Sequence, residues 1–374
     1  MPGDTGSETP DHVAVIGGGA VGTTLAGDLT DRGVDVTLFE RESIGAGASG
    51  RAAGICYDAY TDRRDIAIAG RSIERFRDLA ASFRSVPYVL LAREGDREQE
   101  RAIASLAERM QARGVDIDLV DGATLGQEFP DLVTDDVERA AIARTAGVLD
   151  PESFAEAMAD RAQAGGATIQ TGTQATLNGP RTVRAGDASE RFDAVVVAAG
   201  PATKRIVSEA GVDIPLECYR AQALVTGPLD LDVPTVFDAT NHYYLRPRDS
   251  GILLGDGVDT DVGPDDDHGT ADGSFVDSGR EHLDTALGGE ASVERAWSGL
   301  CTATPDRDPL VGPVDEGLSV ATGWHGHGLM RAPAIAERLA DQLLGGERIA
   351  GFEPTRFAGD EQFEPVEGMT LDEG

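Results

Sequence analysis

One segment near the start constrains the fold more than any other: HVAVIGGGAVGTTLAGDLTDRGVDVTLFERE, residues 12–42. It begins with a short apolar, β-branched run at residues 12–16, which is typical of a buried parallel strand. The amphipathic stretch that follows predicts a helix that reaches Asp31 and stops before Gly33. A second apolar run at residues 34–39 predicts another strand, so the segment indicates a strand–helix–strand unit of an α/β fold.

The turn between the first strand and the helix carries three glycines in the pattern G-x-G-x-x-G. Gly17 permits the tight turn, Gly19 lets a pyrophosphate approach the backbone, and Gly22 lets the helix and strand pack closely. The helix N-terminus offers N–H groups and a partial positive charge to phosphates. Glu40 ends the second strand, where its carboxylate can accept hydrogen bonds from ribose hydroxyls. An acidic residue there disfavours a 2′-phosphate, so the unit predicts FAD or NAD rather than NADP.

The charge of the chain is strongly one-sided, with a formal net charge of −34. Lys204 is its only lysine, so that nearly all the cations are arginines. The charge argues against nucleic acid and anionic membranes as partners. The acids are spread through segments with clear apolar periodicity, which argues against a disordered chain. The composition resembles that of proteins from salt-accumulating halophilic archaea, because single-sign charge is tolerated where salt screens it.

Cysteine usage and the ends of the chain narrow the class further. Cys56, Cys218 and Cys301 are too few and too scattered for a disulfide framework or a Cys-rich zinc site. Residues 1–10 lack the pattern of a signal peptide, and no apolar run is long enough to span a membrane. The acidic stretch 256–277 fits no EF-hand spacing and is expected to be a solvated excursion. We therefore expect a soluble cytoplasmic protein without a metal site; residues 359–374 are expected to form a mobile acidic tail.

A glycine- and alanine-rich stretch, SIGAGASGRAAG at residues 43–54, directly follows the second strand. Here the sequence resembles the D-amino-acid oxidase, glycine oxidase and sarcosine oxidase family of FAD-dependent enzymes, which carries a similar turn against its flavin. NAD as the only cofactor would leave residues 43–54 and 321–330 unexplained, so the resemblance implies FAD. Four further segments match the family in the same order, at residues 147–176, 192–203, 296–313 and 321–344.

The resemblance implies an α/β fold with a discontinuous FAD-binding domain of the Rossmann-like, glutathione-reductase type and a second, β-rich substrate domain. Residues 220–226 and 242–255 are expected to supply strands of the substrate domain. The expected FAD-binding domain comprises residues 1–85, 145–213 and 295–374, and the expected substrate domain comprises residues 86–144 and 214–294.

The cofactor residues follow from the motif and from the resemblance together. The sequence GHG at residues 326–328 opens a helix whose N–H groups are expected to face the N1–C2=O edge of the flavin. The residues expected to contact FAD are Gly17, Gly19, Ala20, Val21, Gly22, Glu40, Arg41, Ala48, Ser49, Arg51, Ala52, Gly54, Ala175, Ala199, Gly200, Gly326, His327, Gly328, Leu329 and Met330.

The first candidate substrate segment is NHYYLRPR at residues 241–248. Strand alternation would place His242, Tyr244 and Arg246 on one face. Tyr244 matches a substrate-facing tyrosine in glycine and sarcosine oxidases. Arg246 is interpreted as the clamp for a substrate carboxylate, because a bidentate guanidinium suits that role. The alternatives are that Arg246 pairs with one of the many acids and that His242 is an ordinary strand residue.

The second candidate segment is GLCTATPD at residues 299–306. Cys301 occupies the position where glycine oxidase-like relatives carry an arginine for the carboxylate and others carry tyrosine. The cysteine that binds flavin covalently in monomeric sarcosine oxidases matches Gly299 instead, so Cys301 is interpreted as a specificity position. Met330 stands where those enzymes have a lysine. With no lysine near the flavin segments, the sequence favours a dehydrogenase over an oxidase.

The sequence-based hypothesis is therefore an FAD-dependent oxidoreductase that oxidises a small amino acid or N-methyl amino acid. Hydride would pass to flavin N5, and the resulting imine would hydrolyse. Two alternatives stay open: a 2-hydroxy-acid dehydrogenase, and a flavin-bound assembly factor without turnover. The expected partners are a small-molecule substrate and either O2 or another electron acceptor, with no nucleic acid and no membrane span; an oligomer is possible.

Overall fold

The structure is a computed structural model that describes residues 9–260, 262–263 and 269–366. The chain forms two compact units, each built from separated stretches of sequence. The described part of the first unit comprises residues up to Gly50, Pro151–Cys218 and Cys301–Val366, and that of the second comprises Arg51–Asp150 and Tyr219–Leu300.

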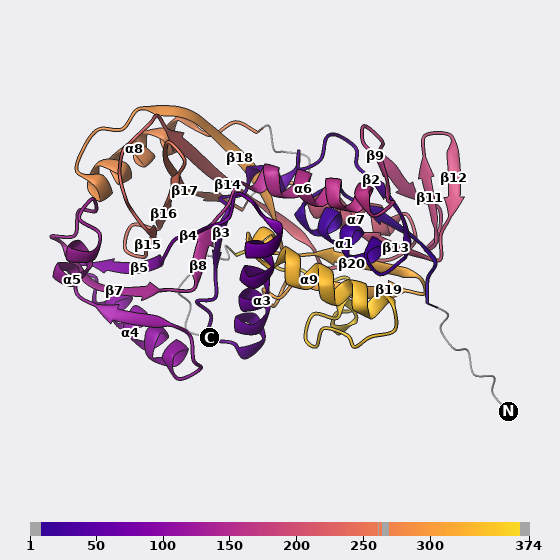
Figure 1. Ribbon diagram of the computed structural model, residues 1–374, viewed down its shortest axis with the longest axis horizontal. Helices are drawn as coiled ribbons and strands as arrows, with labels where there is room; N and C mark the ends of the chain where they lie inside the picture. Colours follow the sequence, from indigo (N-terminus) through magenta and orange to yellow (C-terminus); the bar gives the residue numbers. More distant parts are fainter. Residues whose placement is uncertain (1–8, 261, 264–268, 367–374) are drawn as a thin grey trace. The chain divides into compact units, whose positions relative to one another are not determined.

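A six-stranded sheet in the order β19-β20-β13-β1-β2-β9 forms the centre of the first unit (Figure 1). All its pairings are parallel except the one between β19 and β20. The predicted strand–helix–strand unit is confirmed as β1, α1 and β2. The bounds are β1 His12–Ile16, α1 Ala20–Thr30, β2 Asp35–Phe39, β9 Thr168–Gln170, β13 Ala194–Val197, β19 Leu310–Asp315 and β20 Leu318–Thr322.

Helix α1 is buried along its whole length, because other elements cover it on several sides. It packs against α6 and α9 as well as against the sheet. On its inner side, an added Cβ at Gly22 would lie 2.0 Å from the carbonyl oxygen of Gly17. Arg161 on α6 donates to the buried carboxylate of Asp28 at 2.9 Å, which joins the two helices by an ion pair. The remaining elements of this unit are α6 Pro151–Ala164, β10 Ala175–Leu177, β11 Thr182–Ala185, β12 Ala188–Arg191, η1 Gly200–Ala202, α7 Thr203–Ser208, α9 Gly328–Leu343 and η2 Pro354–Arg356.

The second unit is built on an eight-stranded sheet in the order β18-β14-β17-β16-β15-β5-β7-β6 (Figure 1). Of the pairings with a recorded register, only β15 with β5 is parallel. Leucine, valine and isoleucine side chains from the strands form its main core, together with helix α8. The strand bounds are β5 Tyr88–Arg93, β6 Ile117–Val120, β7 Val137–Ala143, β14 Glu217–Thr226, β15 Thr235–Asp238, β16 Tyr243–Arg248, β17 Gly251–Asp259 and β18 Val293–Ala303.

A small antiparallel sheet, β3-β8-β4, and four longer helices complete the second unit. A short helix, α2, lies at the change from the first unit to the second. The bounds are α2 Ala48–Arg51, β3 Ile55–Tyr57, α3 Arg63–Leu79, β4 Arg84–Ser85, α4 Arg97–Gln111, α5 Gly122–Glu128, β8 Ala146–Val148 and α8 Gly273–Leu287.

The observed division differs from the predicted domain boundaries at residues 51–85, 145–150, 214–218 and 295–300. Residues 214–218 group with the first unit. The other three stretches group with the second unit because β3 and β4 both pair with β8 there and β18 neighbours β14. The assignment of the two units to cofactor and substrate stays a prediction.

Two other sequence expectations can be compared with the described residues. The stretch 242–255, which was expected to supply strands, contains β16 and the first part of β17, and these two strands pair antiparallel. Part of the acidic excursion is fixed, since Arg220 donates to both carboxylate oxygens of Asp272 at 2.9 and 3.2 Å. Positions 261, 264–268 and 367–374 of the excursion and the tail lie outside the described residues. Within the described chain, no helix is both long and apolar enough to cross a membrane.

Candidate functional site: a dinucleotide cradle and a substrate strand

The carboxyl ends of four parallel strands lie along one edge of the sheet in the first unit. Strand β1 leads into the glycine turn, β2 into Glu40, β13 into residues 198–200, and β20 into residues 323–328. Ala198 N–H donates to the carbonyl of Ile16 at 2.8 Å, and Gly17 N–H donates to that of Phe39 at 2.9 Å, so the ends of three strands are joined. Ligands of open α/β sheets bind at this edge.

The glycine turn leaves no room for side chains, which is the property the motif predicts. Gly17 has a φ of +119°, and an added Cβ would lie 2.3 Å from the carbonyl oxygen of Ala198. A Cβ at Gly19 would lie 2.8 Å from Ser49 Oγ. Gly19 is the N-cap of α1 and makes no side-chain cap, so N–H groups of the first turn have no acceptor within the helix.

Glu40 lies at the end of β2 and is held by two backbone N–H groups. Its Oε2 accepts from Gly18 at 2.7 Å, and its Oε1 accepts from Glu42 at 2.8 Å. A carboxylate has about four lone-pair sites, so each oxygen keeps capacity for a ligand hydroxyl. The side chain is half-buried. These two hydrogen bonds hold the carboxylate in one orientation, as its predicted role in binding a ribose would require.

The glycine-rich loop after β2 packs over the glycine turn. Ser49 Oγ accepts from the N–H of Ala20 at 2.9 Å, at the first residue of α1. Gly45 N–H donates to the carbonyl of Gly18 at 3.0 Å, and Gly50 N–H donates to that of Gly45 at 2.9 Å. The loop is therefore attached to the turn at two points, and its small residues permit this close packing.

A second helix N-terminus, that of α9, lies beyond the end of β20. His327 is the N-cap of α9 and makes no side-chain cap to the helix. Burial lowers the pKa of His327 to about 3, and the positive charge of Arg331 acts in the same direction. The imidazole is therefore neutral at physiological pH. The partial positive charge of the α9 N-terminus is therefore the main source of positive potential beyond the end of β20.

These features fit a dinucleotide. The α1 N-terminus with its glycine turn would hold the pyrophosphate, and Glu40 would hold the adenosine ribose. The α9 N-terminus would favour negative charge on the redox ring of the cofactor.

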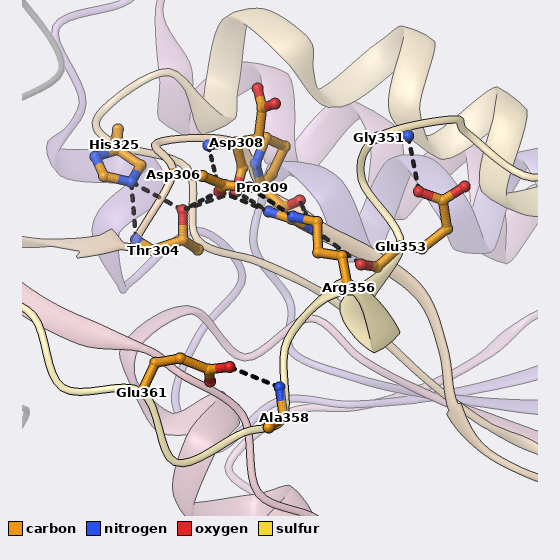
Figure 2. Close-up of polar contacts among 10 residues, drawn as sticks. All are labelled: Thr304, Asp306, Asp308, Pro309, His325, Gly351, Glu353, Arg356, Ala358 and Glu361. Atoms are coloured by element: carbon orange, nitrogen blue, oxygen red, sulfur yellow. Dashed lines mark hydrogen bonds and ion pairs between the residues drawn. The ribbon is translucent and has the colours of Figure 1, made fainter.

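A polar cluster holds the segment that leads out of β18 (Figure 2). His325, with a φ of +47°, has a buried side chain whose Nε2 accepts from the N–H of Thr304 at 2.8 Å. Its Nδ1 therefore carries the proton and donates to the carbonyl of Val366 at 3.2 Å. Arg356 binds Asp306 in the same cluster. Sequence reasoning missed this cluster; the Thr-Pro-Asp turn at residues 304–306 was its only signal.

In the second unit, Tyr244 and Arg246 lie on the same face of β16, as alternation predicts. Arg246 is 4% exposed and binds backbone carbonyl oxygens: Nε donates to Ala53, Nη1 to Pro247 at 3.0 Å and Nη2 to Leu149 at 3.5 Å. Burial, with nearby Arg248, lowers the pKa of Arg246 to about 10, so the group stays charged at neutral pH.

His242 does not share this face as a strand residue, so that prediction was wrong. It precedes β16 in the turn after β15, with a φ of +55°, and its side chain is exposed. The turn is fixed by Asp238, whose Oδ1 accepts from the N–H groups of Thr240 and Asn241 at 3.1 and 3.0 Å. These local hydrogen bonds end the strand pattern before His242.

The other predicted site residues divide by exposure. Arg41 is exposed and pairs with Glu42 at 3.1 Å. The predicted site residues that are buried are Gly17, Ala20, Val21, Gly22, Gly54, Ala175, Arg246, His327, Leu329 and Met330; those that are half-buried are Gly19, Glu40, Ser49, Arg51, Ala52, Ala199, Gly200, Tyr244, Cys301 and Gly328; and those that are exposed are Arg41, Ala48, His242 and Gly326.

The parallel sheet and the glycine turn are typical of a dinucleotide-binding protein, and comparison with known proteins gives the family. The family described as FAD dependent oxidoreductase (DAO) matches residues 12–342. The chain therefore belongs to the DAO family of FAD-dependent oxidoreductases, and its cofactor is FAD.

Three similar proteins show the range of the family. The tRNA 5-methylaminomethyl-2-thiouridine biosynthesis bifunctional protein MnmC of Thiobacillus denitrificans is 31% identical over 94% of this chain, which spans 60% of that protein's length. Glycine oxidase of Geobacillus kaustophilus is 26% identical over 93% of this chain and 97% of its own. The crystal structure of L-proline dehydrogenase from P. horikoshii has a TM-score of 0.85 and 26% identity, covering 93% of this chain and 98% of that one.

Proposed function

We propose that this protein oxidises a small amino acid or N-methyl amino acid at the carbon–nitrogen bond next to the carboxylate. Glycine oxidase and L-proline dehydrogenase, two of its relatives, are named for such substrates. Bound FAD supplies the acceptor for the hydride of the α-carbon. The protein's task is to orient the amine and hold the carboxylate, for which we propose Tyr244 and Arg246.

The state of Arg246 is the observation that carries this proposal. A guanidinium has five N–H donors, and three of those of Arg246 bind carbonyl oxygens. Two N–H groups remain on the terminal nitrogens. Among the described residues, no carboxylate forms an ion pair with Arg246, although the chain contains 66 acidic residues. A buried cation is costly without an anion, and a substrate carboxylate would supply one.

Net charge favours a small substrate over RNA. The relative with 31% identity is named for tRNA modification, yet this chain carries a net charge of −34. Phosphates of RNA bind through lysine and arginine, and a strongly acidic surface repels them. A free amino acid such as glycine carries an ammonium group beside its carboxylate, so it has no net charge for the acidic surface to repel. We therefore propose a low-molecular-weight substrate, and either O2 or another electron acceptor.

Anaerobic reduction of the flavin tests the proposal directly. The purified protein, loaded with FAD, is mixed with glycine, sarcosine, dimethylglycine, proline, D-amino acids and 2-hydroxy acids in turn. Bleaching by an amino acid, with ammonia or an amine as a product, is the expected result. Bleaching by 2-hydroxy acids alone would indicate an alcohol substrate. Full colour with every compound would contradict turnover and favour a flavin-bound assembly factor.

Substitution of Arg246 by methionine tests the clamp. We expect KM for the amino acid to rise about 30- to 100-fold, because one charged hydrogen-bonding group is lost. For an amine substrate that lacks the carboxylate, KM should change little. Arg144→Met is the matched control, since Arg144 belongs to the same unit but binds Glu128 and Asp118. An equal rise of KM for the amino acid and for the amine without a carboxylate would show that Arg246 does not bind the carboxylate.

A further inference from the structure

Strand β17 contains a glycine directly opposite Tyr244. The register of the antiparallel pair β16–β17 places Tyr244 opposite Gly255, and that of β14–β17 places Ala223 opposite Gly255. Directly paired residues of an antiparallel sheet project from the same face. Ala223, Gly255 and Tyr244 therefore form a row across three strands on one face, which Phe237 of β15 continues on the other side of Tyr244. On the β17 side of the tyrosine, both residues of the row are small.

The phenol of Tyr244 occupies the space that a side chain at position 255 would need. An added Cβ at Gly255 would lie 2.0 Å from both Cζ and Oη of Tyr244, and 2.5 Å from Cε1. These distances are far inside van der Waals contact and involve the end of the ring. The ring therefore lies across β17 instead of standing upright beside it. Any residue larger than glycine at position 255 would displace the phenol.

Neighbouring side chains support the ring in this position. Tyr244, Ala53 and Trp297 each pack against one cluster of buried residues, formed by Ala223, Val225 and Leu253. The indole Nε1 of Trp297 donates to the carbonyl of Arg51 at 3.0 Å, and Arg246 donates to the carbonyl of Ala53. The face that carries the phenol is thus attached to the loop at residues 51–54.

Gly255 has no backbone reason of its own to be glycine. It lies inside a strand and is not among the residues with positive φ, so an alanine would fit its backbone. Glycine inside a strand is destabilising relative to alanine and often marks a close approach. The close approach here is to the tyrosine that the proposed site uses.

We propose that Gly255 is a positioning residue, which fixes the phenol of Tyr244 against the sheet and thereby sets the size of amino acid that the site accepts. This inference rests on the proposed function for its second part only. With alanine at position 255, the ring is lifted away from the sheet, and the space above this face decreases. The substitution should weaken the binding of larger substrates more than the binding of glycine.

The position of the ring is tested by 19F NMR of protein labelled with 3-fluorotyrosine. The chain has six tyrosines, and Tyr244→Phe assigns the resonance of interest. Gly255→Ala should shift that resonance, whereas Gly70→Ala should not, because a Cβ at Gly70 meets no atom within 4 Å. An unshifted Tyr244 resonance in Gly255→Ala would overturn the proposal, whatever the substrate is.

The effect on substrate size is tested by the apparent dissociation constants of glycine and proline, taken from the concentration dependence of the rate of anaerobic flavin reduction. We expect Gly255→Ala to weaken proline about tenfold more than glycine, the effect of a small volume change in a pocket. In a Tyr244→Ala background the same substitution should have little effect, since the clashing ring is gone. Equal weakening of both ligands, or an unchanged effect without the ring, would overturn the specificity role. If neither ligand binds the wild-type protein, the proposed function and the specificity role both fail, and the NMR shift still decides the position of the ring.

Discussion

Arg356 donates two parallel hydrogen bonds to the carboxylate of Asp306, from Nε to Oδ2 at 2.7 Å and from Nη2 to Oδ1 at 2.9 Å (Figure 2). Its other three N–H groups reach the carbonyl oxygens of Asp308, Pro309 and Glu353 at 2.7, 3.1 and 3.1 Å. All five donors of the guanidinium are therefore used. The pair joins the turn after β18 to the segment that contains η2, although 50 positions separate the two residues.

Loss of the Arg356 fork should destabilise the first unit. We expect Arg356→Ala to lower the free energy of unfolding by about 2–3 kcal/mol, because a bidentate pair and three carbonyl contacts disappear. Arg356→Lys keeps the charge but not the fork, and should recover less than half of the loss. Urea unfolding measures both. Arg348, an exposed arginine, supplies the control Arg348→Ala, which should stay close to wild type. Equal stability of Arg356→Lys and wild type would show that charge alone matters.

Glu40 should control the affinity for FAD. Its carboxylate is already held by the N–H groups of Gly18 and Glu42, so little ordering is needed on binding. We expect Glu40→Ala to raise the dissociation constant of FAD about 10- to 100-fold, the effect of losing charged hydrogen bonds to a ribose. Flavin fluorescence titration of the apoprotein measures it. Glu42→Gln is the control, because the side chain of Glu42 is exposed and pairs with Arg41. Unchanged affinity in Glu40→Ala would place the ribose elsewhere.

The parts of the fold that depend on local pattern could be predicted from sequence. The turn at Gly17, the helix that begins at Ala20 and the end of β2 at Glu40 follow from residues that are close in the chain. The α9 start after His327 follows from its glycines in the same way. These features need only backbone geometry and apolar periodicity.

What the sequence could not show depends on residues that are far apart. Two of the three carbonyl partners of Arg246 belong to Ala53 and Leu149, more than 90 positions away, and no pattern marks a carbonyl as an acceptor. Gly255 is one of 47 glycines until the register places it opposite Tyr244. His242 was misplaced because Asp238 ends the strand pattern through side-chain hydrogen bonds, which alternation ignores.

His325 should make stability depend on pH in mildly acidic solution. Burial lowers its pKa from 6.5 to about 4, and Arg307 and Arg331 add to the effect, while the hydrogen bond to the Val366 carbonyl and the charge of Asp306 oppose it. The unfolded chain therefore binds the proton more readily, and stability should fall as the pH drops from about 6.5 to about 4. His325→Asn tolerates the positive φ and does not titrate, so its difference from wild type should change across this window. Urea unfolding at several pH values measures the difference. His327 remains in both proteins, and its pKa is set mainly by burial and Arg331, so most of its contribution cancels. A pH-independent difference would show that His325 does not titrate as described.

Salt should stabilise the protein. We propose that the net charge of −34 reflects adaptation to concentrated salt. Repulsion among the carboxylates opposes the compact state, and raising KCl from about 0.2 M to about 2 M shortens the screening length to a few ångströms. The thermal midpoint should rise with KCl far more than with sucrose of equal osmolality, which separates screening from general exclusion. Equal increases with both solutes would contradict the electrostatic explanation.

Replacement of Asp58 by asparagine should stabilise the second unit at neutral pH. Asp58 is 9% exposed, and burial raises its pKa to about 6, although its own backbone N–H and Arg77 oppose the shift. Its Oδ1 is buried and has no hydrogen-bond partner among the described residues. The folded state therefore favours the protonated acid. This contribution to stability is complete below the unfolded pKa near 3.8 and is lost as the pH rises through about 6.

Asp58→Asn removes the cost of the buried charge, so the free energy of unfolding should increase by about 1–2 kcal/mol at about pH 8 and change little at about pH 4. Urea unfolding at both pH values measures the effect. Asp249→Asn is the control, because Asp249 is exposed; Asp62 is unsuitable, because its side chain caps α3. A stability gain of the same size at both pH values would mean that the carboxylate of Asp58 keeps its ordinary pKa.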